Sequence, residues 1–267
     1  MSKLSKLFEL RGTLDRRTSS ICEFIGVVII LIIWTIVSKM EIVPKGILPA
    51  PVKIIQAIPE LHFQDALLRN LFYSFKLNLF GGLEAIALAI PLGFLIGLVP
   101  VLKAIFGRYI EAIRFLPLTA TIGIFIVAFG LGTNMKVQFL AFAIFIYIIP
   151  QVKRRIEEVE EIYVQTAQTL GANTQQKVKK VFIPVVFARV YNDIVNLVAL
   201  SWTYIIVAEM VNTSGGGIGA LTFICFRQGR IDKVYAILIV IILFGMIQDF
   251  VMKKLGKALF PYYEKEC

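Results

Sequence analysis

The sequence predicts an all-α, polytopic membrane protein with six transmembrane helices and a long polar loop between the fourth and the fifth. Three observations favour this fold class. The 267 residues are 58% hydrophobic, and the mean hydropathy of +0.79 is far above that of a soluble domain. Apolar runs recur along the chain at lengths suited to a bilayer. Lys and Arg residues collect in particular loops, as they do on the cytosolic side of membrane proteins.

The first expected span covers 21–37 and follows a basic segment, 1–20. A basic head before an apolar run is also typical of a signal peptide, and Arg16 with Arg17 could form a twin-arginine export signal. No small-residue cleavage site follows the run, and further spans come after it. We therefore expect a retained transmembrane helix, with 1–20 as a cytosolic N-terminal tail.

Five further spans are expected, at 71–98, 115–131, 137–149, 190–211 and 234–251. The loop at 40–66 holds four prolines and has room for one short helix. In the second span, Lys76 and Glu84 are costly in lipid. Lys76 is expected to reach an interface, and Glu84 is a candidate for a polar path.

The third span is interrupted, which makes it the best path candidate by composition. Helix breakers at membrane depth are tolerated only against protein or a water-lined cavity. The segment 114–123 combines such breakers with small polar groups, namely Arg114, Pro117, Thr119, Thr121 and Gly123. The arginine either offers a cation to this path or anchors the span at the cytosolic interface.

The fifth span places Trp202 near its middle and Glu209 near its outer end. Glu209 is either a functional glutamate in a gate or a hydrogen-bonded structural one. The glycine run 215–219 lacks the Lys-Ser/Thr that follows a phosphate-binding loop, so a flexible turn is expected there.

The polar loop 151–189 predicts two successive helices. Apolar residues recur at helical spacing over 156–170, and Gly171 is suited to end that helix. Asn173 and Gln176 match an N-cap with its capping-box partner, so a second helix begins at once. We expect it to stop at Pro184.

The first of these loop helices carries an apolar stripe with glutamates beside it. An anionic membrane surface would repel those glutamates, since interfacial helices normally present Lys and Arg. We expect the stripe to lie in a groove on a partner protein. The alternative is a hairpin that packs only on its own chain.

The basic residues predict that both chain ends lie in the cytosol. Eighteen Lys and Arg fall in segments on one side of the expected membrane and six on the other, with four at the boundaries. This asymmetry also accounts for the net charge of +10 without nucleic acid. Residues 21–252 form the membrane domain, and 253–267 form a C-terminal tail.

Nothing in the sequence indicates a metal site or a catalytic set. His62 is the single histidine, and Cys22, Cys225 and Cys267 fall in places that cannot all meet. No segment matches G-x-x-x-x-G-K-[ST], so this chain is not expected to hydrolyse ATP, to bind a cofactor or to act as an enzyme.

The polar loop resembles a signature of the permease subunits of binding-protein-dependent ABC importers. That signature is Glu-Ala-Ala, three residues, Gly, nine residues, an apolar position, one residue and Leu-Pro. The register here is Gln165-Thr166-Ala167, Gly171, Val181 and Ile183-Pro184, with every spacing kept. Gln165 and Thr166 replace the acid and the first alanine.

Two further patterns resemble the branch of that family that serves nitrate, sulfonates, taurine and bicarbonate. One is an arginine, a proline and an alanine before a Phe-Gly pair, and the other is an Ala-Glu pair before a glycine cluster. The matching residues are Arg114, Pro117, Ala120, Phe129, Gly130, Ala208 and Glu209. The resemblance covers about 68–252, and Gly123 stands where proline is more frequent in that branch.

The resemblance implies a multi-pass subunit of the bacterial inner membrane that passes a small anion. Its partners would be a second copy of itself, two ATPase subunits that use ATP and Mg, membrane lipid and a periplasmic or lipid-anchored binding protein. The ATPase would dock on the coupling-helix loop, at Tyr163, Gln165, Thr166, Ala167, Leu170, Gly171, Ile183 and Pro184. Path candidates are Glu84, Arg114, Pro117, Thr119, Thr121, Trp202 and Glu209.

Two other classes remain open at this point. An ion-coupled secondary transporter would show paired ionisable residues at the membrane midplane, where the sequence offers Glu84 alone. A polytopic membrane enzyme would need a His, Cys or acid constellation of recognisable spacing. Copurification with an ATPase subunit separates the importer from both.

Overall fold

A computed structural model describes residues 12, 14–40 and 46–262 of the chain, and these residues form helices and connecting turns without a strand. Most of the expected tail 1–20, the end of the tail 253–267 and Cys267 lie outside these residues. The elements are α2 (Arg16–Lys39), α3 (Pro51–Phe63), α4 (Leu67–Leu98), α5 (Pro100–Ile113), α6 (Leu118–Phe129), α7 (Thr133–Glu157), α8 (Glu161–Thr169), α9 (Thr174–Lys177), the π-helical turn η1 (Val178–Phe182), α10 (Ile183–Val211), α11 (Ile218–Arg227) and α12 (Ile231–Leu259).

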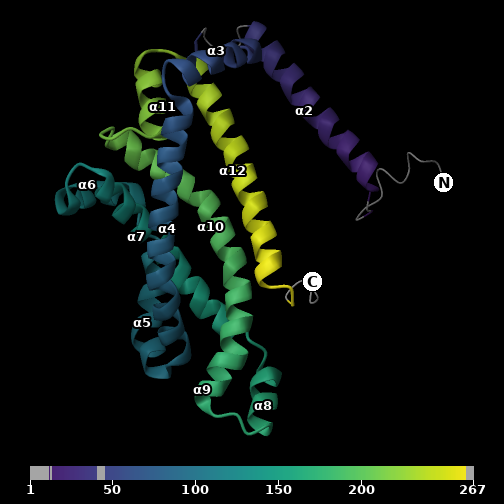
Figure 1. Ribbon diagram of the computed structural model, residues 1–267, viewed down its shortest axis with the longest axis vertical. Helices are drawn as coiled ribbons and strands as arrows, with labels where there is room; N and C mark the ends of the chain where they lie inside the picture. The colour runs from purple at the N-terminus through teal and green to yellow at the C-terminus, as the bar shows by residue number, and fades with distance from the viewer. Residues whose placement is uncertain (1–11, 13, 41–45, 263–267) are drawn as a thin grey trace.

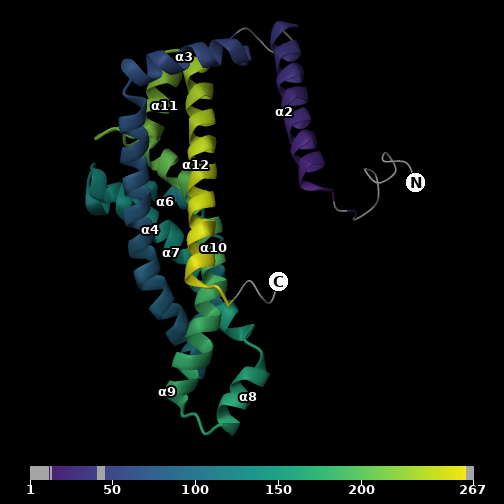
Figure 2. The same ribbon diagram turned by 45° about the vertical axis from the view of Figure 1, so that its right-hand side comes forward.

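The predicted fold class is confirmed. Five helical stretches in the described residues are long and apolar enough to cross a membrane: α2, α4, α7, α12 and the continuous stretch from α9 through η1 to α10. A sixth span is present if α5 and α6 count as one. Figures 1 and 2 show α4, α10 and α12 running along the long axis of the molecule, with the α8 and α9 hairpin at one end and α3 at the other.

Helix α7 is the centre of the bundle. Of the residues in the most apolar 18-residue stretch of α7, 61% are buried in the bundle, against 28% for α4 and 11% for α12. Small residues of α4 allow this close packing, because a Cβ atom added at Gly93 would lie 2.6 Å from Cβ of Val152 on α7. At Gly81 the added atom would lie 3.1 Å from the backbone oxygen of Val137.

The third span is bent rather than straight. Its two helices, α5 and α6, meet at an angle of 103° around residues 114–117. The expected interruption at Pro117 is confirmed, because Pro117 is the N-cap of α6. The expected break at Gly123 is wrong, since Gly123 lies inside α6. A helix of 12 residues is only about 18 Å long, too short to cross the hydrocarbon core.

Two other prolines fail to end the helices as expected. Helix α7 continues past Pro150 to Glu157, so the fourth span is longer than 137–149. Pro184 does not stop the second loop helix, because it occupies the first turn of α10, where a proline is tolerated. The π-helical turn η1 directly precedes α10. It shifts the backbone hydrogen-bond register just before Pro184, which has no N–H to donate.

The helix expected over 156–170 is two elements. Ile156 lies in the last turn of α7 and is buried against α4, where its side chain faces Gly97. The chain turns at Glu158, and α8 begins at Glu161. Helix α11 was not predicted, because its ten residues fall in a segment assigned to an outer loop.

Helix α2 lies beside the bundle and makes few contacts with it. None of the residues in the most apolar stretch of α2 is buried in the bundle, and Figure 2 shows this helix apart from the other long helices. It is held near its end by two hydrogen bonds, from Trp34 Nε1 to the Pro49 oxygen (3.1 Å) and from Ser38 Oγ to the Leu48 oxygen (3.0 Å). The ring of Trp34 also contacts that of Tyr235 on α12.

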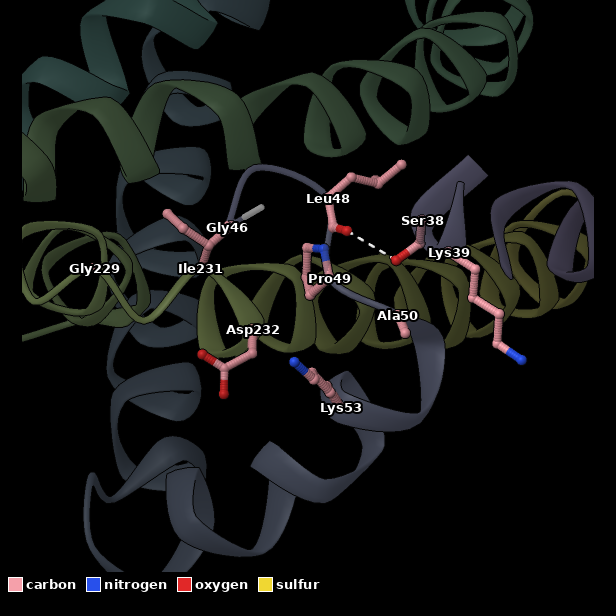
Figure 3. A pocket seen from close by; sticks show the side chains of 10 residues that line it. All are labelled: Ser38, Lys39, Gly46, Leu48, Pro49, Ala50, Lys53, Gly229, Ile231 and Asp232. Carbon is pink, nitrogen blue, oxygen red and sulfur yellow. Dashed lines mark hydrogen bonds between the residues drawn. The ribbon is translucent and has the colours of Figure 1, made fainter. Parts of the chain in front are cut away.

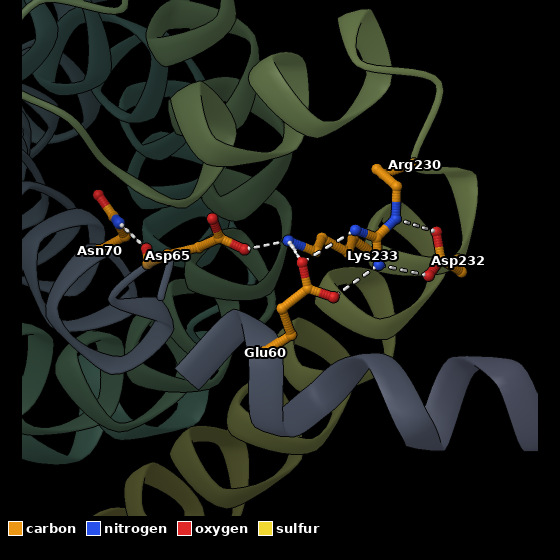
Figure 4. Close-up of polar contacts among 6 residues, drawn as sticks. All are labelled: Glu60, Asp65, Asn70, Arg230, Asp232 and Lys233. Atoms are coloured by element: carbon orange, nitrogen blue, oxygen red, sulfur yellow. Dashed lines mark hydrogen bonds and ion pairs between the residues drawn. The ribbon is translucent and has the colours of Figure 1, made fainter. Parts of the chain in front are cut away.

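An ion cluster fastens α3 to the start of α12 (Figure 4). The Arg230 guanidinium donates to both carboxylate oxygens of Glu60, at 2.9 and 2.8 Å, and also pairs with Asp232. Lys233 Nζ lies 2.8 Å from Glu60 and 2.6 Å from Asp65. Bidentate arginine pairs in a network are better ordered than isolated surface pairs, so this cluster fixes the end of the bundle opposite the hairpin.

The close contact between α4 and α7 predicts an unusual response to a glycine replacement. Gly93→Ala should lower stability by about 1–3 kcal/mol, because the new methyl overlaps Val152, although alanine is the better helix former. Gly123→Ala on α6, with no atom within 4 Å of the added Cβ, is the control and should be neutral or stabilising. Thermal unfolding of the detergent-purified proteins measures both. Equal melting temperatures would contradict this account of the core.

The ion cluster predicts a pH-dependent stability. Hydrogen bonds from Arg230 and then from Lys233 lower the pKa of Glu60 from 4.5 to about 2. A depressed carboxylate pKa stabilises the fold fully above 4.5, and this contribution is lost as the pH falls toward 2. Glu60→Gln should therefore lower the melting temperature more at pH 7 than at pH 3, whereas Glu161→Gln on exposed α8 should have little effect at either pH. A deficit that grows on acidification would exclude this role.

Candidate functional site

The α8 and α9 hairpin is built by two complementary capping motifs. Gly171 follows the C-cap residue Leu170 of α8, and its φ of +79° is easily reached by glycine. The Ala172 N–H donates to the Ala167 oxygen and the Gly171 N–H to the Gln168 oxygen, both at 2.9 Å, which is a Schellman motif. The turn between the helices is therefore fixed by the backbone.

The predicted capping box then starts α9 and is confirmed. The Gln176 N–H donates to Asn173 Oδ1 at 2.9 Å, and the Asn173 N–H donates to Gln176 Oε1 at 2.8 Å. Together the two motifs set the direction of α9 relative to α8.

The hairpin presents apolar side chains that its own chain leaves uncovered. Leu170 is 82% exposed and Ile162 is 58% exposed, and no residue of α8 is buried. Tyr163 is 39% exposed, and Ala167 is half-buried. Gln165 is exposed, and the Thr166 hydroxyl donates within α8 to the Ile162 oxygen.

Ile183 and Pro184 stand apart from the hairpin tip, because both belong to the first turn of α10. The Pro184 oxygen accepts a hydrogen bond from the Tyr262 hydroxyl at 3.1 Å. The structure thus separates the predicted coupling residues into a hairpin group and a group at the start of α10.

Charged residues brace the base of the hairpin. Arg155 on α7 donates to both carboxylate oxygens of Asp193 on α10, at 2.8 and 2.7 Å. Arg189 Nη1 on α10 donates to the backbone carbonyl oxygen of Glu158 at 2.9 Å. Sequence reasoning did not identify these contacts, because residues 31 or more positions apart form them only once α7 and α10 pack together.

Glu209 lies at the centre of a buried hydrogen-bond network. Its carboxylate accepts from Ser74 Oγ on α4, at 2.7 and 2.9 Å, and from the Gly219 N–H at 2.8 Å. Glu209 itself is 0% exposed. Of the two interpretations of Glu209, this geometry matches the hydrogen-bonded structural one.

The glycine turn before α11 is pinned by this network, so the expectation of a flexible turn is wrong. Lys136 Nζ donates to the oxygens of Ser214 and Gly216, at 2.8 and 3.0 Å. The Gly217 N–H donates to Asn70 Oδ1 at 2.9 Å. A side chain at Gly217 would collide with the Glu209 carboxylate, which explains the glycine at φ +118°.

The other path candidates are spread over α4, α6, α10 and the bend between α5 and α6. Trp202 is buried on α10, where Nε1 donates to Gln248 on α12 at 2.9 Å. Arg114 and Pro117 are exposed at the bend between α5 and α6, and the Arg114 guanidinium lies 5.3 Å from the Phe115 ring centre. On α6, Thr119 is exposed, whereas Thr121 is buried and its hydroxyl donates to the Leu118 oxygen.

Glu84 lies on α4, where one carboxylate oxygen accepts from Gln138 Nε2 of α7 at 3.0 Å. Among the residues described, no hydrogen bond or ion pair joins the predicted path residues to one another. Sequence reasoning missed Gln138, Ser74 and Lys136. The sequence signal that could have identified these three residues is a polar side chain in an otherwise apolar helix.

A cavity of about 500 Å³ lies where α2, α3 and α12 approach one another (Figure 3). Lys39, Lys53 and Asp232 contribute its charged lining. Figure 3 shows the Lys53 amine on the same side as Asp232, whereas the Lys39 amine points away.

The described residues contain no group of three His, Cys, Asp or Glu side chains placed to hold a metal ion. Cys22 and Cys225 are free thiols, one exposed and one buried.

Comparison with known proteins identifies relatives along most of the chain. A putative ABC transporter permease of Methanocaldococcus jannaschii is 29% identical over 184 residues, covering 69% of each chain. The taurine transport system permease TauC of Escherichia coli is 23% identical over 88% of this chain and 87% of its own. The bicarbonate transport system permease CmpB of Synechocystis is 21% identical over 92% of this chain and 91% of its own.

Solved structures share the fold. A chain of the MetNI methionine ABC transporter, in an inward-facing conformation, superimposes with a TM-score of 0.63 at 17% identity, covering 72% of this chain and 95% of that one. A chain of an amino acid ABC transporter superimposes with a TM-score of 0.61 at 16% identity, covering 76% and 97%.

The family match includes the bent span, the hairpin and Glu209 itself, since it extends over residues 89–260. The relatives are transport components rather than enzymes. The chain therefore belongs to the family of binding-protein-dependent transport system inner membrane components, the permease subunits of ABC importers.

Proposed function

We propose that two copies of this chain form the path by which an ATP-driven importer of the bacterial inner membrane moves a small anion. The anion, an organosulfonate, nitrate or bicarbonate, arrives on a substrate-binding protein. Separate ATPase subunits use ATP and Mg. The observation that carries this proposal is the α8 and α9 hairpin, with Leu170 exposed at its tip.

The hairpin has the properties of a docking element. Its turn is fixed by backbone hydrogen bonds, so an ATPase groove would meet a preorganised surface at a low entropic cost. An apolar side chain that is 82% exposed argues against a hairpin that packs only on its own chain. We place the hairpin and both chain ends in the cytosol, because the basic segments collect on that side.

The hairpin is connected to the membrane helices through rigid elements. Arg155 and Arg189 join the end of α7 to the start of α10, the two helices between which the hairpin lies in the chain. When the ATPase subunits close on ATP, the hairpins would move with them, and the two bundles would rock between inward-open and outward-open states. In this scheme, the 21–252 membrane domain carries the path and 151–189 carries the coupling surface.

The cargo assignment is supported by named relatives. TauC is a taurine permease, SsuC of Bacillus subtilis is a putative aliphatic sulfonates permease, and CmpB is a bicarbonate permease. All three names refer to small anionic or anion-bearing compounds. The binding protein supplies most of the selectivity in this proposal, and the permease supplies the path.

The docking proposal predicts that a charge at the hairpin tip uncouples the complex. Burying a leucine is worth about 1.5–3 kcal/mol, and Leu170→Asp would also bury an unpaired charge. ATPase copurification should fall by about tenfold or more, and substrate uptake should fall with it. Gly171→Val should act through geometry, because a β-branched residue resists φ of +79°.

Gln175→Asp adds the same charge to an exposed position of α9 and serves as the control. Native mass spectrometry of the purified complex should find two copies of this chain in wild type and in the control. Full uptake by Leu170→Asp at normal membrane abundance would refute the docking role. Loss of both Leu170→Asp and Gly171→Val from the membrane would instead indicate a self-packed hairpin.

The cargo proposal is tested with the cognate binding protein. Equilibrium binding should detect an organosulfonate, nitrate or bicarbonate at micromolar or lower concentration, and the reconstituted complex should import that compound only with ATP. A binding protein that holds a sugar or a purely cationic compound would overturn the anion assignment.

A further inference from the structure

A second cavity lies between α4, α6 and α7, within the part of the bundle that is apolar enough to be in the membrane. Its volume is about 370 Å³, within the range of small-ligand sites. Figure 1 shows α6 beside α7, partway along the length of α4. The lining consists of Glu84, Ala85, Leu88, Phe125, Phe129, Gln138, Ala141, Phe142 and Phe145.

Glu84 gives this cavity its chemistry. It lies near the middle of α4 (Leu67–Leu98), about 25 Å along the helix from Leu67. An ionisable group at such a depth is costly and is normally retained for a function. Gln138 Nε2 donates to Oε2 of Glu84 at 3.0 Å, which orients the carboxylate, and Oε1 accepts none of the hydrogen bonds described.

The remaining walls suit a cation. Phe125 lies 5.9 Å from Phe129 and 5.5 Å from Phe142, measured between ring centres, and all three rings line the cavity. Aromatic faces attract cations, and ammonium groups are recognised by aromatic side chains in this way. No Lys or Arg is among the lining residues. The cavity thus combines one carboxylate with aromatic rings and has no positive charge of its own.

We propose that this cavity binds an ammonium group of the transported compound. The inference rests on the proposed import function and narrows its cargo. A compound with an anionic group alone, such as nitrate or bicarbonate, gains nothing from a carboxylate in an apolar pocket and is repelled by it. A compound that carries both an ammonium group and a sulfonate can place its ammonium end at Glu84. The structure therefore favours an amino-substituted sulfonate over a simple oxoanion.

A lipid acyl chain is the competing occupant, since most of the lining is apolar. Lipid would be indifferent to the charge of Glu84. The carboxylate is therefore the group that separates the two occupants, and Glu84→Gln is the informative change. Glutamine keeps the size of the side chain and can still bond to Gln138, so the variant should fold.

Binding is measured on the purified complex without reference to transport. Saturation-transfer NMR compares ethylammonium, 2-aminoethanesulfonate and ethanesulfonate. The first two carry an ammonium group, and the third carries the sulfonate alone. Wild type should give signals for the two ammonium compounds, and Glu84→Gln should weaken these signals by about tenfold. Glu23→Gln, an exposed position on α2, is the control and should match wild type. Equal signals for all three compounds, unchanged by Glu84→Gln, would assign the cavity to lipid.

Transport gives the second readout. In proteoliposomes with ATP and the cognate binding protein, Glu84→Gln should lower uptake of 2-aminoethanesulfonate by about tenfold and leave ethanesulfonate uptake unchanged or increased. Equal losses for both sulfonates would overturn the ammonium site while leaving the importer intact. If wild type imports neither sulfonate, the cargo assignment fails, and the NMR comparison still decides the site.

Discussion

The structure depends on the close approach of α4 and α7. Lipid offers no hydrophobic force between helices, so their association relies on van der Waals packing and on polar contacts. Gly81 and Gly93 remove the side chains that would hold the two backbones apart, and the side chain of Val152 occupies the space at Gly93. With α7 fixed against α4, its other faces receive α6 and α10. The buried Glu209 network and the Glu84 cavity both exist because α4 lies against its neighbours at this distance.

The sequence was a good guide to which segments are helical and a poor guide to what proline does in them. Hydropathy located the membrane helices, and the caps at Gly171 and Asn173 were predictable because each depends on residues a few positions apart. Pro117 bends the chain, whereas Pro150 and Pro184 lie within continuous helices. For Pro150 the reason is tertiary, because α7 is held along its length by neighbouring helices that override a local preference. Pro184 is tolerated because it lies in the first turn of α10.

The candidate sites divide in the same way. The hairpin could be identified from the sequence because its pattern is local, but the contacts that brace it could not, since Arg155 and Asp193 meet only after α7 and α10 pack. Glu209 was noticed as an acid near a span end, yet its partner Ser74 lies 135 positions away. Polar residues in apolar helices are thus visible in a sequence, while the pairings that decide their roles require the fold.

The unbroken stretch from Thr174 to Val211 has a mechanical consequence. Its 38 residues form a rod about 57 Å long that begins directly after the hairpin turn and ends beside Glu209. The irregular part of this stretch, the π-helical turn η1 with Pro184 after it, lies near the cytosolic end. From Pro184 onward the stretch is regular α-helix, so tilting it there would displace its far end as a lever does. The glycine turn, anchored to that far end through the Glu209 carboxylate, would be carried along. Events at the two faces of the membrane would then be linked by one stiff arm rather than by a chain of separate contacts.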